Sequence, residues 1–178
     1  MTMSSRTMLV AAAVAALGGA GCTGIRASQA RDAHMKEQLQ AYVFPMACEE
    51  LWVDALKVIA YHDFKMVGDD RKLVGQETQG AVGRFMARGH PSHRDDKGVF
   101  ESESDADNAQ VRYRVRGTPD GEKRCRVEYT GIKMDRMDNN ETYWREYDYE
   151  LELMAKVAPA DASRISLGMD EAAAKASK

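Results

Sequence analysis

A strict alternation of apolar and charged residues around one turn sequence constrains the fold of this chain more than any other feature. Three apolar residues and three arginines alternate in the order Val111, Arg112, Tyr113, Arg114, Val115, Arg116. Pro119-Asp120-Gly121 follows, and residues 124–129 then alternate again. A period of two is typical of a strand with one buried face, and Pro-Asp-Gly fits a three-residue hairpin loop with its glycine in the left-handed conformation. The segment therefore predicts an antiparallel hairpin centred on Asp120.

This register places every apolar residue of the hairpin on one face. The predicted apolar pairs are Val115 with Cys125, Tyr113 with Val127, and Val111 with Tyr129. On the open face the predicted pairs are Arg114 with Arg126, Arg116 with Arg124, and Arg112 with Glu128. Like charges directly opposite each other cost roughly a few tenths of a kcal/mol. We expect Glu150 and Glu152, on a following strand, to relieve this cost.

Two interpretations of the arginines remain open. The first is a solvated face whose charges neutralise one another. The second is a surface that binds anions or an acidic partner, such as phospholipid headgroups or an acidic protein loop. The candidate partner-binding residues are Arg112, Arg114, Arg116, Arg124 and Arg126.

The clearest helix is predicted over residues 46–60. Its apolar residues recur every three or four positions, at Cys48, Leu51, Trp52, Ala55, Leu56 and Ile59. Pro45 suits the first turn of a helix, where its missing N–H costs nothing. Just before it, the alternation of Leu39, Ala41 and Val43 predicts a short strand. After it, residues 61–67 and 72–78 are expected to form a hairpin, and segments 83–88 and 99–104 to pair with each other.

The segment 144–154 is ambiguous. Its helical interpretation uses a stripe of Trp144, Tyr147, Leu151 and Met154, whereas residues 146–153 alternate strictly between acidic and apolar or aromatic side chains. The unbroken period of two favours a strand that ends at Pro159. We then expect a C-terminal helix that Asp161 caps and that carries Ile165, Met169 and Ala172.

Residues 1–21 have the pattern of a secretory leader. Arg6 supplies a positive charge, residues 8–17 are an uninterrupted apolar run, and the small residues 18–21 lead to Cys22. A basic start, a short apolar core and a small-residue cleavage region define such leaders, and this run is too short to span a bilayer. Export would place the remaining chain in an oxidising compartment.

The small residues directly before Cys22 resemble the lipobox of bacterial lipoproteins. The resemblance implies that the Cys22 sulfur receives diacylglycerol and that the leader is removed before Cys22. Thr23, where Asp would suggest inner-membrane retention, favours the outer membrane. Gly19 stands where the family usually has a bulky aliphatic residue, so the alternative is ordinary secretion with Cys22 left as a thiol.

The predicted organisation is a leader over residues 1–21, the lipidated Cys22 and a polar tether over residues 22–38, and one domain over residues 39–178. Without the leader the chain keeps 24 basic and 28 acidic residues, because Arg6 is the leader's one charge. This mildly acidic balance gives no nucleic-acid signature. Cys48 and Cys125 both fall on core-facing positions and are a disulfide candidate whose loop would constrain the unfolded chain by about 4 kcal/mol. Two buried thiols are the alternative.

The order of short strand, helix, antiparallel strands and C-terminal helix predicts an α+β fold. In it a two-layer antiparallel sheet carries an N-terminal and a C-terminal helix on one face. This order, over residues 39–176, resembles the helix-grip lipoprotein domains of the outer-membrane β-barrel assembly machine, of the BamC type. The resemblance implies a protein-interaction module of the cell envelope.

Catalytic motifs are missing from the sequence. It has neither a Gly-x-Ser-x-Gly sequence nor a phosphate-cradling glycine loop. His90 and His93 could ligate a metal only with Asp95 or Asp96 recruited, and such a loop pair without a third fixed ligand predicts no metal site. We therefore expect neither an enzyme nor a cofactor.

The function predicted from the sequence is that of an outer-membrane-anchored, periplasm-facing lipoprotein that works as a non-enzymatic interaction or assembly module. Its expected partners are the membrane, through the lipid anchor, and an envelope protein, but no nucleic acid. The alternative is a module that binds a small ligand or lipid in the groove between helix and sheet.

Overall fold

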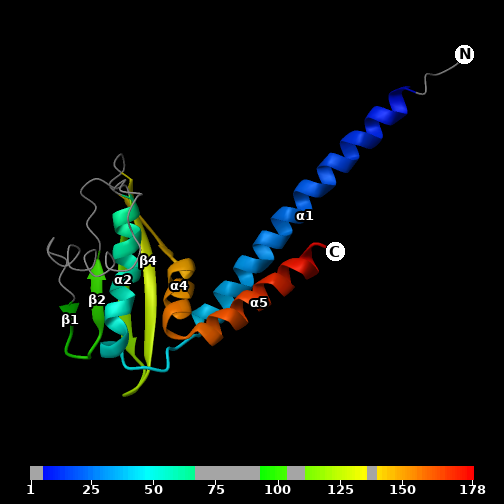
Figure 1. Cartoon of the computed structure of the whole chain (residues 1–178). Helices are drawn as coiled ribbons and strands as arrows, with labels where there is room; N and C mark the ends of the chain where they lie inside the picture. Colours follow the sequence, from blue (N-terminus) through cyan, green and yellow to red (C-terminus); the bar gives the residue numbers. More distant parts are fainter. Residues whose placement is uncertain (1–5, 67–92, 104–110, 136–139) are drawn as a thin grey trace, which may run out of the picture. The chain divides into compact units, whose positions relative to one another are not determined.

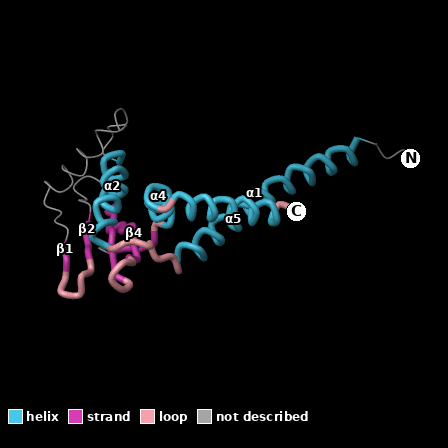
Figure 2. The backbone as a smooth tube through the Cα atoms, turned by 60° about the horizontal axis from the view of Figure 1, so that its bottom comes forward, coloured by secondary structure: helices cyan, strands magenta, loops and turns pink. Residues whose placement is uncertain are grey.

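In the computed structural model the chain divides into two units, residues 41–162 and the two chain ends, which are described separately. The structure describes the backbone of residues 6–66, 93–103, 111–135 and 140–178, and the side chains of residues 23–62, 94–103, 111–134 and 140–178. The elements in Figures 1 and 2 are α1 (Arg6–Gln40), α2 (Cys48–Met66), β1 (His93–Arg94), β2 (Phe100–Glu103), β3 (Val111–Pro119), β4 (Cys125–Asp135), β5 (Asn140–Arg145), α4 (Tyr147–Val157) and α5 (Pro159–Ala176).

The described strands form one antiparallel sheet in the order β1-β2-β3-β4-β5. Each strand pairs with its neighbour in the sequence, which makes the sheet a meander. Helix α2 contacts β2, β3 and β4, and α4 contacts α2 and β4. Figure 1 shows α2 running along the sheet next to β4. The predicted α+β class is confirmed.

The predicted helix over residues 46–60 is confirmed as α2, which begins at Cys48 and continues to Met66. All six of its predicted apolar residues are buried. The strand predicted at residues 61–67 is wrong over 61–66, because His62 continues the stripe three residues after Ile59 and stacks on Tyr149 of α4, with ring centroids 3.8 Å apart. The expected hairpin partner 72–78 and the segment 83–88 lie outside the described residues, whereas segment 99–104 contains β2.

The hairpin is confirmed with its predicted faces but in a different register. Val115 pairs with Tyr129 and Pro119 with Cys125, so each β3 residue faces a β4 residue four positions later than expected. The strands extend further because the turn is longer: the Asp120 N–H donates to the Arg124 carbonyl at 2.9 Å. Gly121 has the predicted positive φ of 82°. A shift by an even number of residues leaves every side chain on its expected face.

The strand predicted over residues 146–153 is wrong. These residues lie mostly in α4, whose buried side chains are Tyr149, Glu150, Leu153 and Met154. Their spacing matches one face of a helix, and the contact of α4 with α2 outweighs the alternation in the sequence. Pro159 begins α5 rather than ending a strand, and Ile165 and Met169 of that helix are buried as expected.

The unit at the chain ends pairs α1 with α5. Arg31 forms an ion pair with Asp170 at 2.9 Å, and a Cβ on Gly168 would lie 2.2 Å from His34 Nε2. The contact residue on α5 moves toward its N-terminus as the contact residue on α1 moves toward its C-terminus, so the two helices are antiparallel. Cys22 therefore lies level with the C-terminal end of α5. The polar tether therefore lies within a helix.

The short strand predicted around Leu39 is also wrong. Leu39 belongs to α1, which ends at Gln40. Phe44, at the end of the predicted strand, makes an isolated β-bridge with Cys125. An alternation of three small or aliphatic residues is too short to distinguish a strand from the last turn of a helix.

Candidate functional site

The sheet face opposite α2 carries interleaved arginine and glutamate side chains. We call this surface the Arg–Glu face, and its members from β2 to β5 are Glu101, Glu103, Arg112, Arg114, Arg116, Arg126, Glu128, Glu141 and Arg145. They share a face because successive side chains of a strand alternate and the register aligns the alternation across strands. The apolar partners Val115, Val127 and Tyr129 point to the buried face.

Glutamates from two other strands hold the arginines of β3. Arg114 pairs with Glu103 of β2 through two nitrogens, at 2.7 and 2.9 Å, and Arg112 pairs with the same carboxylate at 2.8 Å. Arg112 also binds Glu141 of β5. The hydrogen bond that Arg114 donates to Glu103 is the main cause that raises the pKa of Arg114. The guanidinium groups are thus fixed in place by neighbours while remaining partly exposed.

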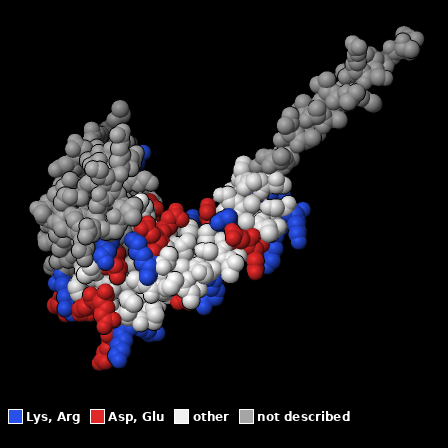
Figure 3. Space-filling view, viewed as in Figure 1, with Lys and Arg blue, Asp and Glu red and all other residues white. Residues whose placement is uncertain are grey.

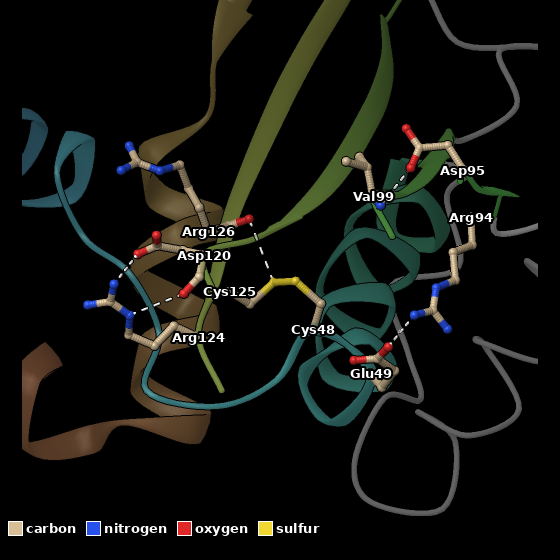
Figure 4. Close-up of a disulfide and its surroundings, with 9 residues drawn as sticks. All are labelled: Cys48, Glu49, Arg94, Asp95, Val99, Asp120, Arg124, Cys125 and Arg126. Atoms are coloured by element: carbon tan, nitrogen blue, oxygen red, sulfur yellow. Dashed lines mark hydrogen bonds and ion pairs between the residues drawn. A yellow bond between two sulfur atoms is a disulfide. The ribbon is translucent and has the colours of Figure 1, made fainter. Parts of the chain in front are cut away.

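The structure brings four of the five predicted arginines to this face. Arg112 and Arg114 lie in the ion pairs above, Arg116 is exposed between Glu101 and Glu128, and Arg126 faces Thr118. Arg124 lies in the turn instead, where it binds the Asp120 carboxylate at 2.9 Å, as Figure 4 shows.

The predicted arginine pairs do not occur. Arg114 faces Thr130 and Arg116 faces Glu128, because of the four-residue change in register. The relief expected from Glu150 and Glu152 was also wrong, since both lie on α4. The glutamates of β2, β4 and β5 take that role. Figure 3, which has the view of Figure 1, shows basic and acidic side chains interspersed on the side of the molecule that carries α2.

At the end of β5, Arg145 of the Arg–Glu face forms an ion pair with the buried Glu150 of α4. Its Nε and Nη2 donate to the two carboxylate oxygens of Glu150 at 2.7 and 3.0 Å, and its Nη1 binds Glu128 at 3.1 Å. Glu150 is 2% exposed, and burial raises its pKa although Arg145 acts in the opposite direction. Its carboxylate also lies 3.5 Å from the Tyr129 N–H, at the point where β5 ends. Sequence reasoning missed this pair because it placed Glu150 on a strand.

A second polar cluster joins α2 to α4. His62 Nε2 lies 2.7 Å from Glu152 Oε2, and Lys156 binds the other oxygen of that carboxylate at 3.1 Å. Burial opposes ionisation of Glu152, but the bonds from His62 and Lys156 outweigh it and lower the pKa. The neighbouring Tyr149 has its pKa raised by burial first and then by a hydrogen bond with Tyr113. The helix stripe of residues 59 and 62 is the sequence signal that could have located this contact.

Cys48 and Cys125 form a disulfide in the structure (Figure 4). It joins the start of α2 to the start of β4, with the two Cα atoms 4.9 Å apart and the two cysteines separated by 77 positions in the sequence. Phe44 brings the two elements together, since its N–H and carbonyl both bond to the Cys125 backbone, at 2.8 and 3.1 Å. Both cysteines are buried, as their predicted core-facing positions require.

For three other residues considered from the sequence, the structure does not describe the side chain. Cys22 is in α1 and His93 begins β1, but neither side chain is among those described, and His90 lies outside the described residues. Within the described part of the chain, three or more potential metal ligands do not cluster anywhere. The described helices include none that is both long and apolar enough to cross a membrane.

Comparison of the chain with protein-family models, curated proteins and solved structures finds no match.

Proposed function

We propose that this protein is a lipoprotein anchored to the outer membrane through Cys22, facing the periplasm, and that its domain is a non-enzymatic interaction or assembly module of the cell envelope. The observation that carries the proposal is the disulfide between Cys48 and Cys125, in a chain whose residues 1–21 have the pattern of a secretory leader. Disulfides persist in oxidising compartments, so the leader and the disulfide independently favour export.

The helix pair α1 and α5 is compatible with an anchor at Cys22. The chain's C-terminus lies level with Cys22 because the helices are antiparallel, so one end of this unit would meet the membrane. Between Cys22 and Gln40 the helix is about 27 Å long at about 1.5 Å per residue. The polar segment would then act as a spacer of defined length rather than a loose tether.

The proposed domain architecture is a two-layer, helix-grip-like arrangement. Helices α2 and α4 contact each other, and α2 contacts the three central strands. The helical layer would cover the apolar face of the sheet and leave the Arg–Glu face to solvent. Such a division gives the domain one face for stability and one for recognition.

The Arg–Glu face supports the interaction role. The guanidinium groups of Arg112, Arg114 and Arg145 are held by carboxylates, so a partner would meet these charges in fixed positions at little entropic cost. The alternative ligand groove has less support, because Tyr129 lies fully buried between helix and sheet and donates its hydroxyl to the Ala55 carbonyl at 2.9 Å. A ligand there would have to displace packed side chains.

Co-purification from crosslinked envelopes tests the interaction role in the full chain. Arg116→Glu combined with Arg126→Glu should remove the co-purifying partner, because both residues belong to the Arg–Glu face. Arg124→Glu is the matched control and should retain the partner, since that arginine lies in the turn. Equal recovery with all three proteins would contradict the proposal. A lipid retained by the purified protein in native mass spectrometry would favour the ligand-binding alternative instead.

A further inference from the structure

Strand β5 forms one edge of the described sheet. Of the described strands, only β4 pairs with it. The strand is exposed from Asn140 to Tyr143, and the Tyr143 side chain is 54% exposed. An edge strand of this kind presents backbone N–H and C=O groups that another strand can pair with.

The pattern of backbone hydrogen bonds identifies which residues of β5 face outward. Glu146 N–H donates to the Tyr129 carbonyl at 2.8 Å, so the β4 residues that bond toward β5 are Tyr129 and every second residue after it. In an antiparallel ladder hydrogen-bonded and non-bonded pairs alternate. The partners Trp144 and Thr142 therefore bond inward to β4. The backbone groups of Glu141, Tyr143 and Arg145 point away from the sheet.

We propose that β5 pairs antiparallel with β5 of a second copy of this chain, centred on Tyr143. Tyr143 would then lie opposite its own symmetry mate, and Glu141 opposite Arg145 of the second copy, in both directions. About six backbone hydrogen bonds would form, because all three outward-facing residues would take part. A pairing of one patch with itself is the usual geometry of a two-fold dimer.

Charge selects this register among those that the backbone allows. A centre on Glu141 would oppose two carboxylates, and a centre on Arg145 would oppose two guanidinium groups. The centre on Tyr143 alone pairs the acidic residue with the basic one at both ends. It also extends the alternation of the Arg–Glu face across the edge, since Glu141 already binds Arg112 and Arg145 already binds Glu128.

The proposed contact is small, which fits a weak association. One strand pair buries much less than a standard interface, and such contacts belong to transient complexes. Confinement to a membrane raises the effective concentration of the two copies. The raised effective concentration rests on the proposed lipid anchor, whereas the register of the pairing does not.

Site-specific crosslinking of the full chain in isolated membranes tests the pairing. Tyr143→Cys should form a disulfide-linked dimer on mild oxidation, because directly opposite Cα atoms in a hydrogen-bonded pair are about 5.5 Å apart, within disulfide range. Thr142→Cys is the matched control: its symmetry mate would lie about 8 Å away diagonally, beyond that range. Val53→Cys, exposed on α2, reports random collision. Folding of each variant is checked by its intact Cys48–Cys125 disulfide.

Adding Glu141→Lys to the Tyr143→Cys protein should reduce the dimer about tenfold, because lysine would face arginine twice. A Tyr143→Cys protein that stays monomeric, or crosslinking at Thr142 equal to that at Tyr143, overturns the proposed pairing. The proposed dimer and the proposed lipid anchor can be contradicted separately. A monomeric protein in the membrane fraction contradicts only the dimer. A protein that is free of the membrane and has an unmodified Cys22 contradicts the anchor.

Discussion

Replacing Cys48 and Cys125 together by alanine removes the covalent link between α2 and β4. The crosslink closes a loop of 77 residues, for which the chain-entropy relation gives a stabilisation of about 4.5 kcal/mol. Both cysteines are less than 3% exposed, so loss of the sulfur atoms also leaves a small unfilled volume beside Trp52 and Gly117. We therefore expect the free energy of unfolding to fall by about 4–5 kcal/mol.

Urea unfolding of the mature protein, followed by circular dichroism, measures this loss. With an m value of about 1–3 kcal/mol/M, the midpoint should fall by about 1.5 M or more. Cys48→Ala alone should lose nearly as much as the double variant, because either change abolishes the crosslink. The wild-type protein with its disulfide reduced is the matched control and should behave like the variants. A loss below about 1 kcal/mol in the double variant would refute the reasoning.

Three further predictions concern single side chains. Glu150→Ala should destabilise the protein by about 3–5 kcal/mol in urea unfolding, because Arg145 is left charged and without its buried partner; a loss under 1 kcal/mol would contradict this. Glu152 has a lowered pKa in the folded state, so it contributes stability above about pH 4.3 that disappears as the pH falls through the folded pKa. The difference in free energy of unfolding between wild type and Glu152→Gln should therefore shrink with falling pH, and a constant difference would contradict the assignment. Gly168→Ala should stabilise the His34→Ala protein by up to about 1 kcal/mol, as alanine does in an unobstructed helix, and should stabilise the wild-type protein less, because the His34 ring must move away from the new Cβ. Thermal unfolding of the four proteins measures this, and an equal gain in both backgrounds would contradict it.

The sequence predicted which face of a strand or helix is buried more reliably than it predicted which other element that face contacts. The alternation around Asp120 gave the correct faces of β3 and β4, because the period of a strand is a local property. The register depended on the turn, and Pro119 in fact extends β3 rather than entering the loop. Residues 147–153 fit both a strand and a helix in their local pattern, and the contact of α4 with α2, which the sequence does not reveal, decides for the helix.

The candidate site, too, could be predicted from the sequence only in part. The arginines of β3 could be placed on an open face from the alternation alone. Their partners Glu103 and Glu141 come from strands on either side of the hairpin, and the register of those two further strands, which the sequence pattern does not supply, brings them into contact. The contact of Glu150 with Arg145 required the correct assignment of α4, so it could not be predicted.

Cys48 and Cys125 illustrate how two local predictions can combine. Each cysteine was assigned to the buried face of its own element, and the predicted export leader made their oxidation chemically reasonable. The wrong register did not matter, because it moved Cys125 along the sheet without changing its face.

Mass spectrometry of the N-terminal tryptic peptide tests the central claim most directly. Trypsin cuts after Arg26, so the mature protein extracted from membranes should give a peptide of residues 22–26 with Cys22 at its start. We expect this peptide to carry a diacylglyceryl group on the Cys22 sulfur and an acyl chain on its amino group. A peptide with a free Cys22 thiol, or a chain that retains residues 1–21, would contradict it.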